Sequence, residues 1–304
     1  MVLAELERRY AGPHPLRNYF DLVSGTSTGG ILALGLGASF SPLELADLYV
    51  RRGKDIFPPY PDTALGRLKG SLRKLGRYAR YSHNPAVLRQ ILEDMLGDRL
   101  LGSSTLRLAI PAFDGKHGEI FVYKTPHHRD YKFDRLELMV DVALATAAAP
   151  TYFRPHHHGG YTLVDGGIWA NNPIMLALVE ALTCFDLDRA QIDILSIGCG
   201  SDPYIVSKAQ ISLGGMWYWR DIFEAQTRLQ SLAAINQARL LLGPPSVLRL
   251  DPPNTLPPIE LDDWRRSVKI LEPAARALID QQGDVIARMF MSEPTQPYCP
   301  ISPD

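Results

Sequence analysis

The stretch Tyr19–Gly30, YFDLVSGTSTGG, decides the fold of this 304-residue chain. Its first half, Tyr19–Ser24, is a short and mostly apolar run closed by Gly25, and such a run predicts a buried strand. Its second half carries the pattern G-x-S-x-G with Ser27 at the centre, and a helix is predicted from about Gly29. A strand, a tight turn and a helix in this order favour an α/β fold.

Ser27 is the candidate nucleophile of this turn. A serine hydroxyl attacks an ester only when it protrudes beside a base, and a strand-to-helix turn presents it in that way. Gly25 and Gly29 permit the close backbone packing, and the N–H of Thr28 at the start of the helix is available to an oxyanion. Two other interpretations remain, a turn that only caps the helix and a phosphate-binding loop. A nucleoside triphosphate loop is disfavoured because no Gly-Lys-Ser/Thr follows Gly30.

Helix and strand signals alternate along the first two thirds of the chain. Helices are expected over Met1–Tyr10, from Ser41, from Asn84 to Gly97, over Leu138–Ala148 and from Asn172, and strands over Leu106–Ala112, Glu119–Lys124, Tyr161–Asp165 and Ile192–Gly198. The last two strands flank a helix, which predicts parallel neighbours in one sheet. Eleven of the 24 prolines lie from Pro244 onward, among two further helices predicted near 222–242 and 262–291. We expect an α/β catalytic domain at 1–205 and a helical, proline-rich extension at 206–304.

Asp165 is the candidate base. It ends a predicted strand and is followed at once by Gly166 and Gly167, so a rigid element holds its carboxylate while the glycines allow a close approach. A carboxylate can take a serine proton when its surroundings raise its proton affinity. The competing interpretation is that the Asp-Gly pair only forms a turn.

Histidine offers a weaker alternative for the base. All eight histidines lie at or before His158, whereas the usual α/β-hydrolase order puts the histidine last, after the acid. A Ser-His-Asp esterase would need Asp114 or Asp130 together with one residue of the run His156–His158. None of these residues sits in a motif that would position it.

Four motifs together carry a family resemblance. They are GTSTGG (Gly25–Gly30), AAAPTYF (Ala147–Phe153), VDGG (Val164–Gly167) with NNP (Asn171–Pro173), and SIGCG (Ser196–Gly200). This combination resembles the patatin-like phospholipase family over roughly residues 1 to 200.

The resemblance implies a fold and a chemistry. The fold is a three-layer α/β/α sandwich with a mostly parallel central sheet. The activity is that of a lipid acyl hydrolase of phospholipase A type, with Ser27 as nucleophile, Asp165 as base, an acyl-enzyme, and no metal or other cofactor. Some members of the family act in antiphage defence and are switched on by cyclic nucleotides, so a small-molecule activator or a homo-oligomer is a possible partner.

One family motif is missing before Ser27. The family normally begins with a strand and a D-G-G-G-x-R-G loop that helps to hold the oxyanion, but Gly12 and Gly25 are the only glycines before Ser27 here. We therefore expect either an N-terminal truncation or an incomplete oxyanion site, with a strand missing beside the serine strand. This expectation leaves a second function class open, a weak or inactive member that serves as a regulatory or binding module.

Composition and charge exclude several partners and compartments. Thirty-two basic against 33 acidic residues leave a net charge of −1, which does not favour binding to duplex nucleic acid. The three cysteines, Cys184, Cys199 and Cys299, are far apart and favour a reducing compartment. The charged start MVLAELERRY is unlike a signal peptide. We expect a cytoplasmic protein that is peripheral to the membrane when active.

Three surface features complete the candidates. The segment Arg67–Arg89 holds seven basic and no acidic residues, which favours docking on anionic lipid headgroups, or else a solvated helix face. The run Trp217–Trp219 is expected in the core or a subunit contact rather than at a membrane. The run His156–His158 is expected to be a polar surface turn, because the sequence shows no second pair of metal ligands at a suitable spacing.

Overall fold

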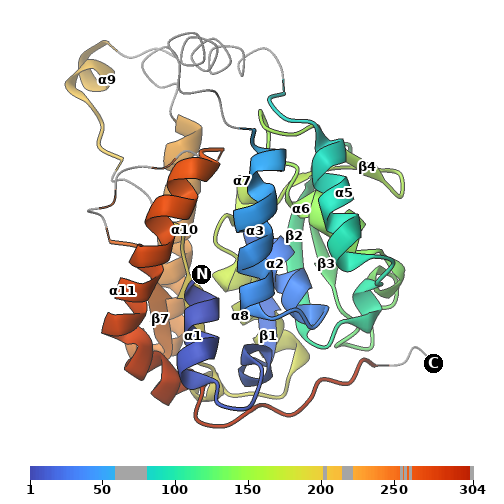
Figure 1. Cartoon of the computed structure of the whole chain (residues 1–304), viewed down its shortest axis with the longest axis vertical. Coiled ribbons are helices and arrows are strands. Elements are labelled where there is room, and N and C mark those ends of the chain that lie inside the picture. The colour runs from blue at the N-terminus through green and yellow to red at the C-terminus, as the bar shows by residue number, and fades with distance from the viewer. Residues whose placement is uncertain are drawn as a thin grey trace.

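The structure is a computed structural model that describes residues 1–58, 81–200, 204–213, 222–253, 256, 259 and 262–301 (Figure 1). Its helices are α1 (Val2–Tyr10), α2 (Thr28–Gly37), α3 (Pro42–Ile56), α5 (Pro85–Leu96), α6 (Met139–Thr146), α7 (Gly167–Ala170), α8 (Ile174–Cys184), α9 (Lys208–Leu213), α10 (Ile222–Leu242) and α11 (Trp264–Phe290). Its strands are β1 (Leu22–Ser24), β2 (Arg107–Asp114), β3 (Glu119–Lys124), β4 (His156–His158), β5 (Tyr161–Asp165), β6 (Ile194–Ile197) and β7 (Val247–Leu250).

The predicted helix starts at Ser41 and Asn84 are confirmed with their caps. The Ser41 hydroxyl accepts from the N–H of Glu44, and the Glu44 carboxylate accepts from the N–H of Ser41 at 2.8 Å, which completes a capping box at α3. Asn84 Oδ1 accepts from the N–H of Ala86 at 3.0 Å at the start of α5. Local sequence therefore determines where these two helices begin.

The main sheet has the strand order β1-β2-β5-β4, with β3 paired to β2 as a side branch. Only β1 and β2 are parallel among these pairs, whereas β2–β3, β2–β5 and β4–β5 are antiparallel. The sheet is thus mixed, and the prediction of a mostly parallel sheet is wrong for the described strands. For two of these three antiparallel pairs the reason is local, because short turns join β2 to β3 and β4 to β5, and a short turn can only return a strand antiparallel. Gly159 and Gly160, both at positive φ, form the second of these turns.

Helices cover both faces of the main sheet. On one face α2 and α6 contact the sheet, with α3 and α5 packed outside them, and on the other face α7 and α8 contact it, with α10 behind. Figure 1 shows α3 and α5 toward the viewer, and α8 and α10 on the far side. The expected α/β/α sandwich is confirmed, and its core is built from large apolar side chains such as Leu34, Leu92, Leu108 and Met139.

The strand β6 does not join the main sheet. It pairs in parallel with β7 in a separate two-stranded sheet, so the prediction that β5 and β6 are neighbours is wrong. The partner was hidden because Val247–Leu250 is a run of only four residues in a region that reads as helical. Helix α11 lies along α1, as Figure 1 shows, and residues such as Leu6 and Ile279 pack there. We propose residue 205 as a working domain boundary, across which β7 and α11 contact the first unit.

Candidate active site

The turn at Ser27 has the geometry of a nucleophile elbow. Ser27 lies between β1 and α2 with φ 57° and ψ −124°, a backbone conformation that non-glycine residues rarely adopt. The structure holds it there with a hydrogen bond from the Ser27 N–H to Thr146 Oγ1 at 3.1 Å. The neighbouring Thr26 hydroxyl donates to the carbonyl of Ala170 at 2.6 Å. Such a strained serine, fixed from two sides, is typical of a catalytic position.

The glycines around Ser27 are not equivalent. A β-carbon on Gly25 would lie 2.1 Å from the carbonyl oxygen of Gly29, and one on Gly30 would lie 2.7 Å from Thr146 Cγ2. A β-carbon on Gly29 would meet nothing within 4 Å. Close packing therefore requires glycine at positions 25 and 30. Gly29, the second glycine of the G-x-S-x-G pattern, is not required for packing.

The side chain of Asp165 interacts with that of Ser27. It ends β5, is only 4% exposed, and donates its N–H to the carbonyl of Ala148 at 3.1 Å. Its carboxylate accepts a hydrogen bond from the Ser27 side chain, and Oδ1 accepts from the N–H of Gly167 at 2.7 Å. Burial raises the pKa of Asp165 to about 6, although the Ser27 and Gly167 hydrogen bonds oppose the shift. The pair therefore joins a strained serine to a carboxylate of increased basicity.

The two glycines after Asp165 have separate roles. A β-carbon on Gly166 would lie 2.4 Å from the carbonyl oxygen of Pro111, so only glycine lets the chain pass β2 here. Gly167 supplies the N–H that orients the carboxylate. Trp169, two residues further along α7, donates Nε1–H to the carbonyl of Ala112 at 2.8 Å and holds α7 against β2. All five predicted motif glycines and threonines, Gly25, Thr28, Gly29, Gly166 and Gly167, thus lie at the two chain segments that carry Ser27 and Asp165.

Thr146 is a positioning residue that the sequence reasoning missed. Its hydroxyl is fully buried, accepts from the Ser27 N–H and donates to the carbonyl of Pro111 at 2.6 Å. It thereby connects the nucleophile turn to β2 at the end of α6. The available signal was the one hydroxyl of a mostly apolar helix, at its last position, because a buried polar group needs partners.

The histidines of the esterase alternative are engaged away from Ser27. His156 lies 3.1 Å from Asp141, and His158 Nε2 lies 2.6 Å from Glu137. His157 contacts the hydroxyl of Thr162 at 3.1 Å. The candidate acid Asp114 is bonded to His117, and the candidate Asp130 lies 3.5 Å from His128. These contacts favour the Ser27–Asp165 pair over a triad.

Comparison with known families agrees with this geometry. A family model described as patatin-like phospholipase matches residues 1–178. The chain belongs to the patatin-like phospholipase family. The family model thus covers the elbow at Ser27 and the aspartate at the end of β5, while α10, β7 and α11 lie beyond it.

Several relatives of this patatin-like chain carry informative names. A cGAMP-activated phospholipase of Escherichia coli (strain TW11681) is 37% identical over 224 residues, 69% of this chain and 60% of the relative. One of Pseudomonas aeruginosa (strain BWHPSA011 / Pa011) is 33% identical over 244 residues, 80% of this chain and 70% of the relative. Patatin-like protein 2 of Oryza sativa subsp. indica is 31% identical over 235 residues, which are 66% of this chain and 57% of the relative. The chain spans less than two thirds of the first and third of these relatives.

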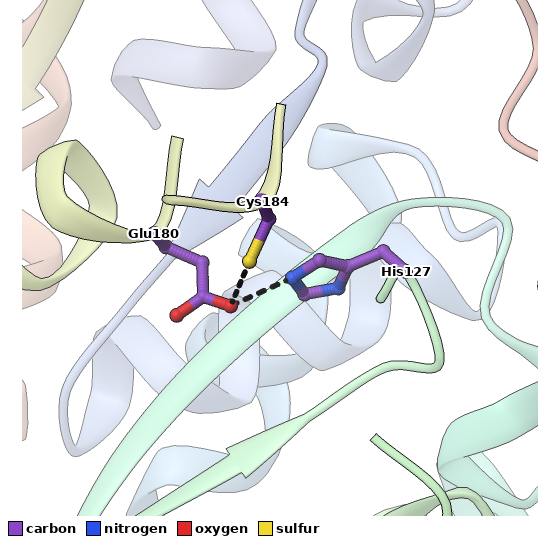
Figure 2. Close-up of side chains that lie close together, drawn as sticks. All are labelled: His127, Glu180 and Cys184. Atoms are coloured by element: carbon purple, nitrogen blue, oxygen red, sulfur yellow. Dashed lines mark hydrogen bonds and ion pairs between the residues drawn. The ribbon is translucent and has the colours of Figure 1, made fainter. Parts of the chain in front are cut away.

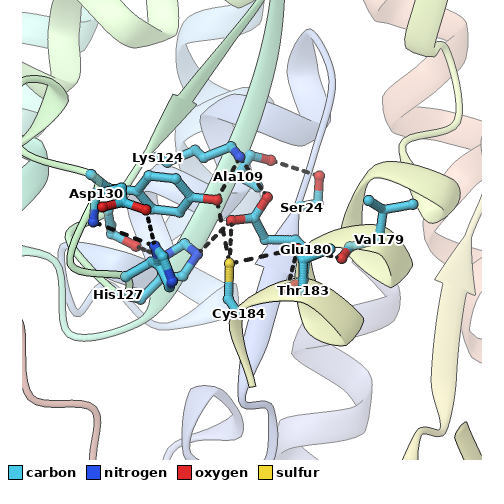
Figure 3. Close-up of polar contacts among 12 residues, drawn as sticks. Ser24, Ala109, Lys124, His127, Asp130, Val179, Glu180, Thr183 and Cys184 are labelled. Atoms are coloured by element: carbon cyan, nitrogen blue, oxygen red, sulfur yellow. Dashed lines mark hydrogen bonds and ion pairs between the residues drawn. The ribbon is translucent and has the colours of Figure 1, made fainter. Parts of the chain in front are cut away.

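A second polar cluster lies between α8 and the segment after β3. Figure 2 shows one oxygen of Glu180 facing both other side chains, with His127 Nε2 at 3.0 Å and Cys184 Sγ at 3.2 Å from Oε1. Figure 3 adds Lys124, whose Nζ lies 2.7 Å from Glu180 Oε2 and donates to Tyr131 at 2.8 Å. Burial acts to raise the pKa of Glu180, but hydrogen bonds led by His127 and Lys124 lower it to about 2. The carboxylate is therefore ionised and already balanced by the ammonium of Lys124, whose side chain is 22% exposed.

Only part of the segment predicted to dock on a membrane surface lies within the described residues. Of the basic segment Arg67–Arg89, the residues up to Arg80 lie outside the described residues, as does the run Trp217–Trp219. Arg89 is described and is paired with Asp141 at 3.1 Å and Glu93 at 3.5 Å, so it is not a free headgroup contact. Among the described helices none has the length and apolar character that crossing a bilayer requires.

Proposed function

We propose that this chain is a lipid acyl hydrolase of phospholipase A type that works through the pair Ser27 and Asp165. The observation that carries the proposal is the strained Ser27 turn facing a buried carboxylate whose pKa is raised to about 6. At neutral pH that carboxylate is mostly ionised, yet it is a stronger base than an ordinary aspartate. Both properties are needed to remove the proton of a serine hydroxyl.

The reaction has two halves. In the first, Ser27 Oγ attacks the ester carbon, its proton passes to Asp165, and collapse of the tetrahedral intermediate expels the lysolipid alcohol, which takes that proton. In the second, water attacks the acyl-enzyme, Asp165 takes the water proton, and the fatty acid leaves as Ser27 regains its hydrogen. The N–H of Gly29 donates to the carbonyl of Thr26 at 2.8 Å, which leaves the N–H of Thr28 as the elbow donor for the oxyanion.

The regulation and location of the enzyme are proposals of the same kind. The name cGAMP-activated phospholipase, carried by several relatives, supports a cyclic dinucleotide as small-molecule activator. A role in defence against phage, a cytoplasmic location and peripheral binding to a lipid surface accord with that regulation. The lipid contact falls on the basic residues Arg67–Arg80.

Phospholipid vesicles test the function directly. The purified chain is incubated with anionic or zwitterionic vesicles, with and without cGAMP, and the products are analysed by mass spectrometry. We expect fatty acid and lysophospholipid in wild type, with a preference for anionic vesicles that weakens at high salt. Release of the headgroup, or equal fatty acid release by Ser27→Ala, contradicts the proposal.

The raised pKa of Asp165 predicts an acid limit to activity. The base works only when it is deprotonated, so kcat/KM should fall about tenfold for each pH unit below about 6. The same shift makes folding stability greater at low pH, and this contribution is lost as pH rises through about 6. Hydrolysis of a soluble short-chain ester between pH 4.5 and 8 measures the limit. A flat profile down to pH 4.5 would exclude Asp165 as the base.

A further inference from the structure

A set of metal-ligating side chains lies where α6 faces the edge strand β4. His156 and His158 stand two residues apart on β4, so both point to the same side of the strand. Nε2 of His156 lies 3.1 Å from Asp141 Oδ1, and Nδ1 of His158 lies 3.9 Å from Asp141 Oδ2. The three potential ligand atoms all lie within 4.8 Å of one another. In a tetrahedral zinc site the ligand atoms are about 3.3 Å apart, so closure requires only small shifts.

Neighbouring side chains orient these three residues, as the groups around a metal site orient its ligands. Glu137 Oε2 lies 2.6 Å from Nε2 of His158, which orients the ring so that its other nitrogen faces Asp141. Arg89 donates to Oδ1 of Asp141 at 3.1 Å. Nε2 of His156 is buried, and its polar neighbour within the described part of the chain is Asp141 Oδ1, at 3.1 Å. A buried imidazole nitrogen in that state is suited to a metal.

We propose that His156, His158 and Asp141 bind a divalent transition metal of the zinc class, with Glu137 as the positioning residue of His158. Two imidazole nitrogens and a carboxylate are the donors that zinc accepts, and a fourth position is left for water. The sequence hid this site because the carboxylates belong to a separate segment, at positions 137 and 141. That i, i+4 pair is brought to the strand only by the packing of α6 against β4.

Charge and access distinguish this site from the cluster around Glu180. Here, among the described residues, two carboxylates face the guanidinium of Arg89, which leaves an excess negative charge for a cation. The side chains of Glu137 and His158 are 31% and 32% exposed. At the other cluster Lys124 already neutralises the one carboxylate, and the side chains of His127 and Glu180 are 0% and 3% exposed. A bound ion at β4 would clip the edge strand to α6, whose far end holds Thr146 against Ser27.

Zinc titration of the whole chain tests the site. The protein is produced without a polyhistidine tag, freed of metal with a chelator, and titrated with zinc chloride by calorimetry. We expect one zinc per chain with a Kd of about 1 µM or tighter, and a melting temperature raised by about 5 °C in excess zinc. His156→Ala and His158→Ala should each weaken binding at least about 100-fold, and Glu137→Gln about 10- to 100-fold.

Two matched controls keep the result specific. His157→Ala changes the neighbouring exposed histidine of the same strand and should leave the Kd within about twofold. Cys184→Ser alters the other cluster and should do the same. Absence of binding at 100 µM zinc overturns the proposal, as does loss of binding in His157→Ala or Cys184→Ser with binding kept in His156→Ala. If His156→Ala does not fold, the more exposed His158→Ala decides between the outcomes.

Discussion

Ser27→Ala and Asp165→Asn should each lower ester turnover by about 10⁴-fold or more, and the double variant should be scarcely worse than either one. The reason is that the nucleophile and its base act as one unit, so that either loss removes nearly the whole contribution. The carboxylate accepts the hydrogen bond of the serine side chain, and asparagine cannot take the serine proton. Single-turnover and steady-state rates on a short-chain ester, with labelling by a fluorophosphonate probe, measure the effect.

Folding controls separate lost chemistry from lost structure. Alanine keeps the β-carbon that Ser27 already places at positive φ, so Ser27→Ala should melt within about 2 °C of wild type. Asp165→Asn removes a buried charge whose pKa is raised by that burial, so its melting temperature should be unchanged or higher at pH 7. Alanine at His156, His157 or His158 should cost little activity. A 1000-fold loss in any of these would instead support the triad.

Gly25→Ala should destabilise the chain by more than about 3 kcal/mol, whereas Gly29→Ala should be neutral or slightly stabilising. The new methyl at 25 would lie 2.1 Å from the backbone oxygen of Gly29, and backbone cannot move aside as a flexible side chain does. A methyl at 29 meets nothing within 4 Å, lies in the first turn of α2, and adds helix propensity of up to about 1 kcal/mol. Thermal and urea unfolding of both variants measures the difference.

Activity provides a second readout of the same contrast. Any Gly25→Ala protein that folds should lose about 100-fold in turnover, because the turn that carries Ser27 must shift. Gly29→Ala should keep the Ser27 φ and most of its reaction with a fluorophosphonate probe. Equal stability of the two variants would show that the close packing at Gly25 is not what holds the elbow.

Local sequence was sufficient to predict most of the elements and to single out the proposed pair Ser27 and Asp165. The caps at Ser41 and Asn84 determine helix starts through contacts within four residues, and the turn around Ser27 is specified by glycines beside it. Asp165 could be singled out because it ends an apolar strand and precedes two glycines. These signals are short-range, so they survive in a single sequence.

Only the tertiary structure decided which distant segments meet. It paired β6 with β7 rather than with β5 and placed β5 antiparallel to β2, because these pairings join segments that lie far apart in the chain. The same long-range packing put Thr146 behind Ser27 and buried Asp165, which raises its pKa. It also turned the expected polar turn at His156–His158 into an edge strand facing Asp141. Burial and proximity are properties of the folded chain, and no local pattern of residues encodes them.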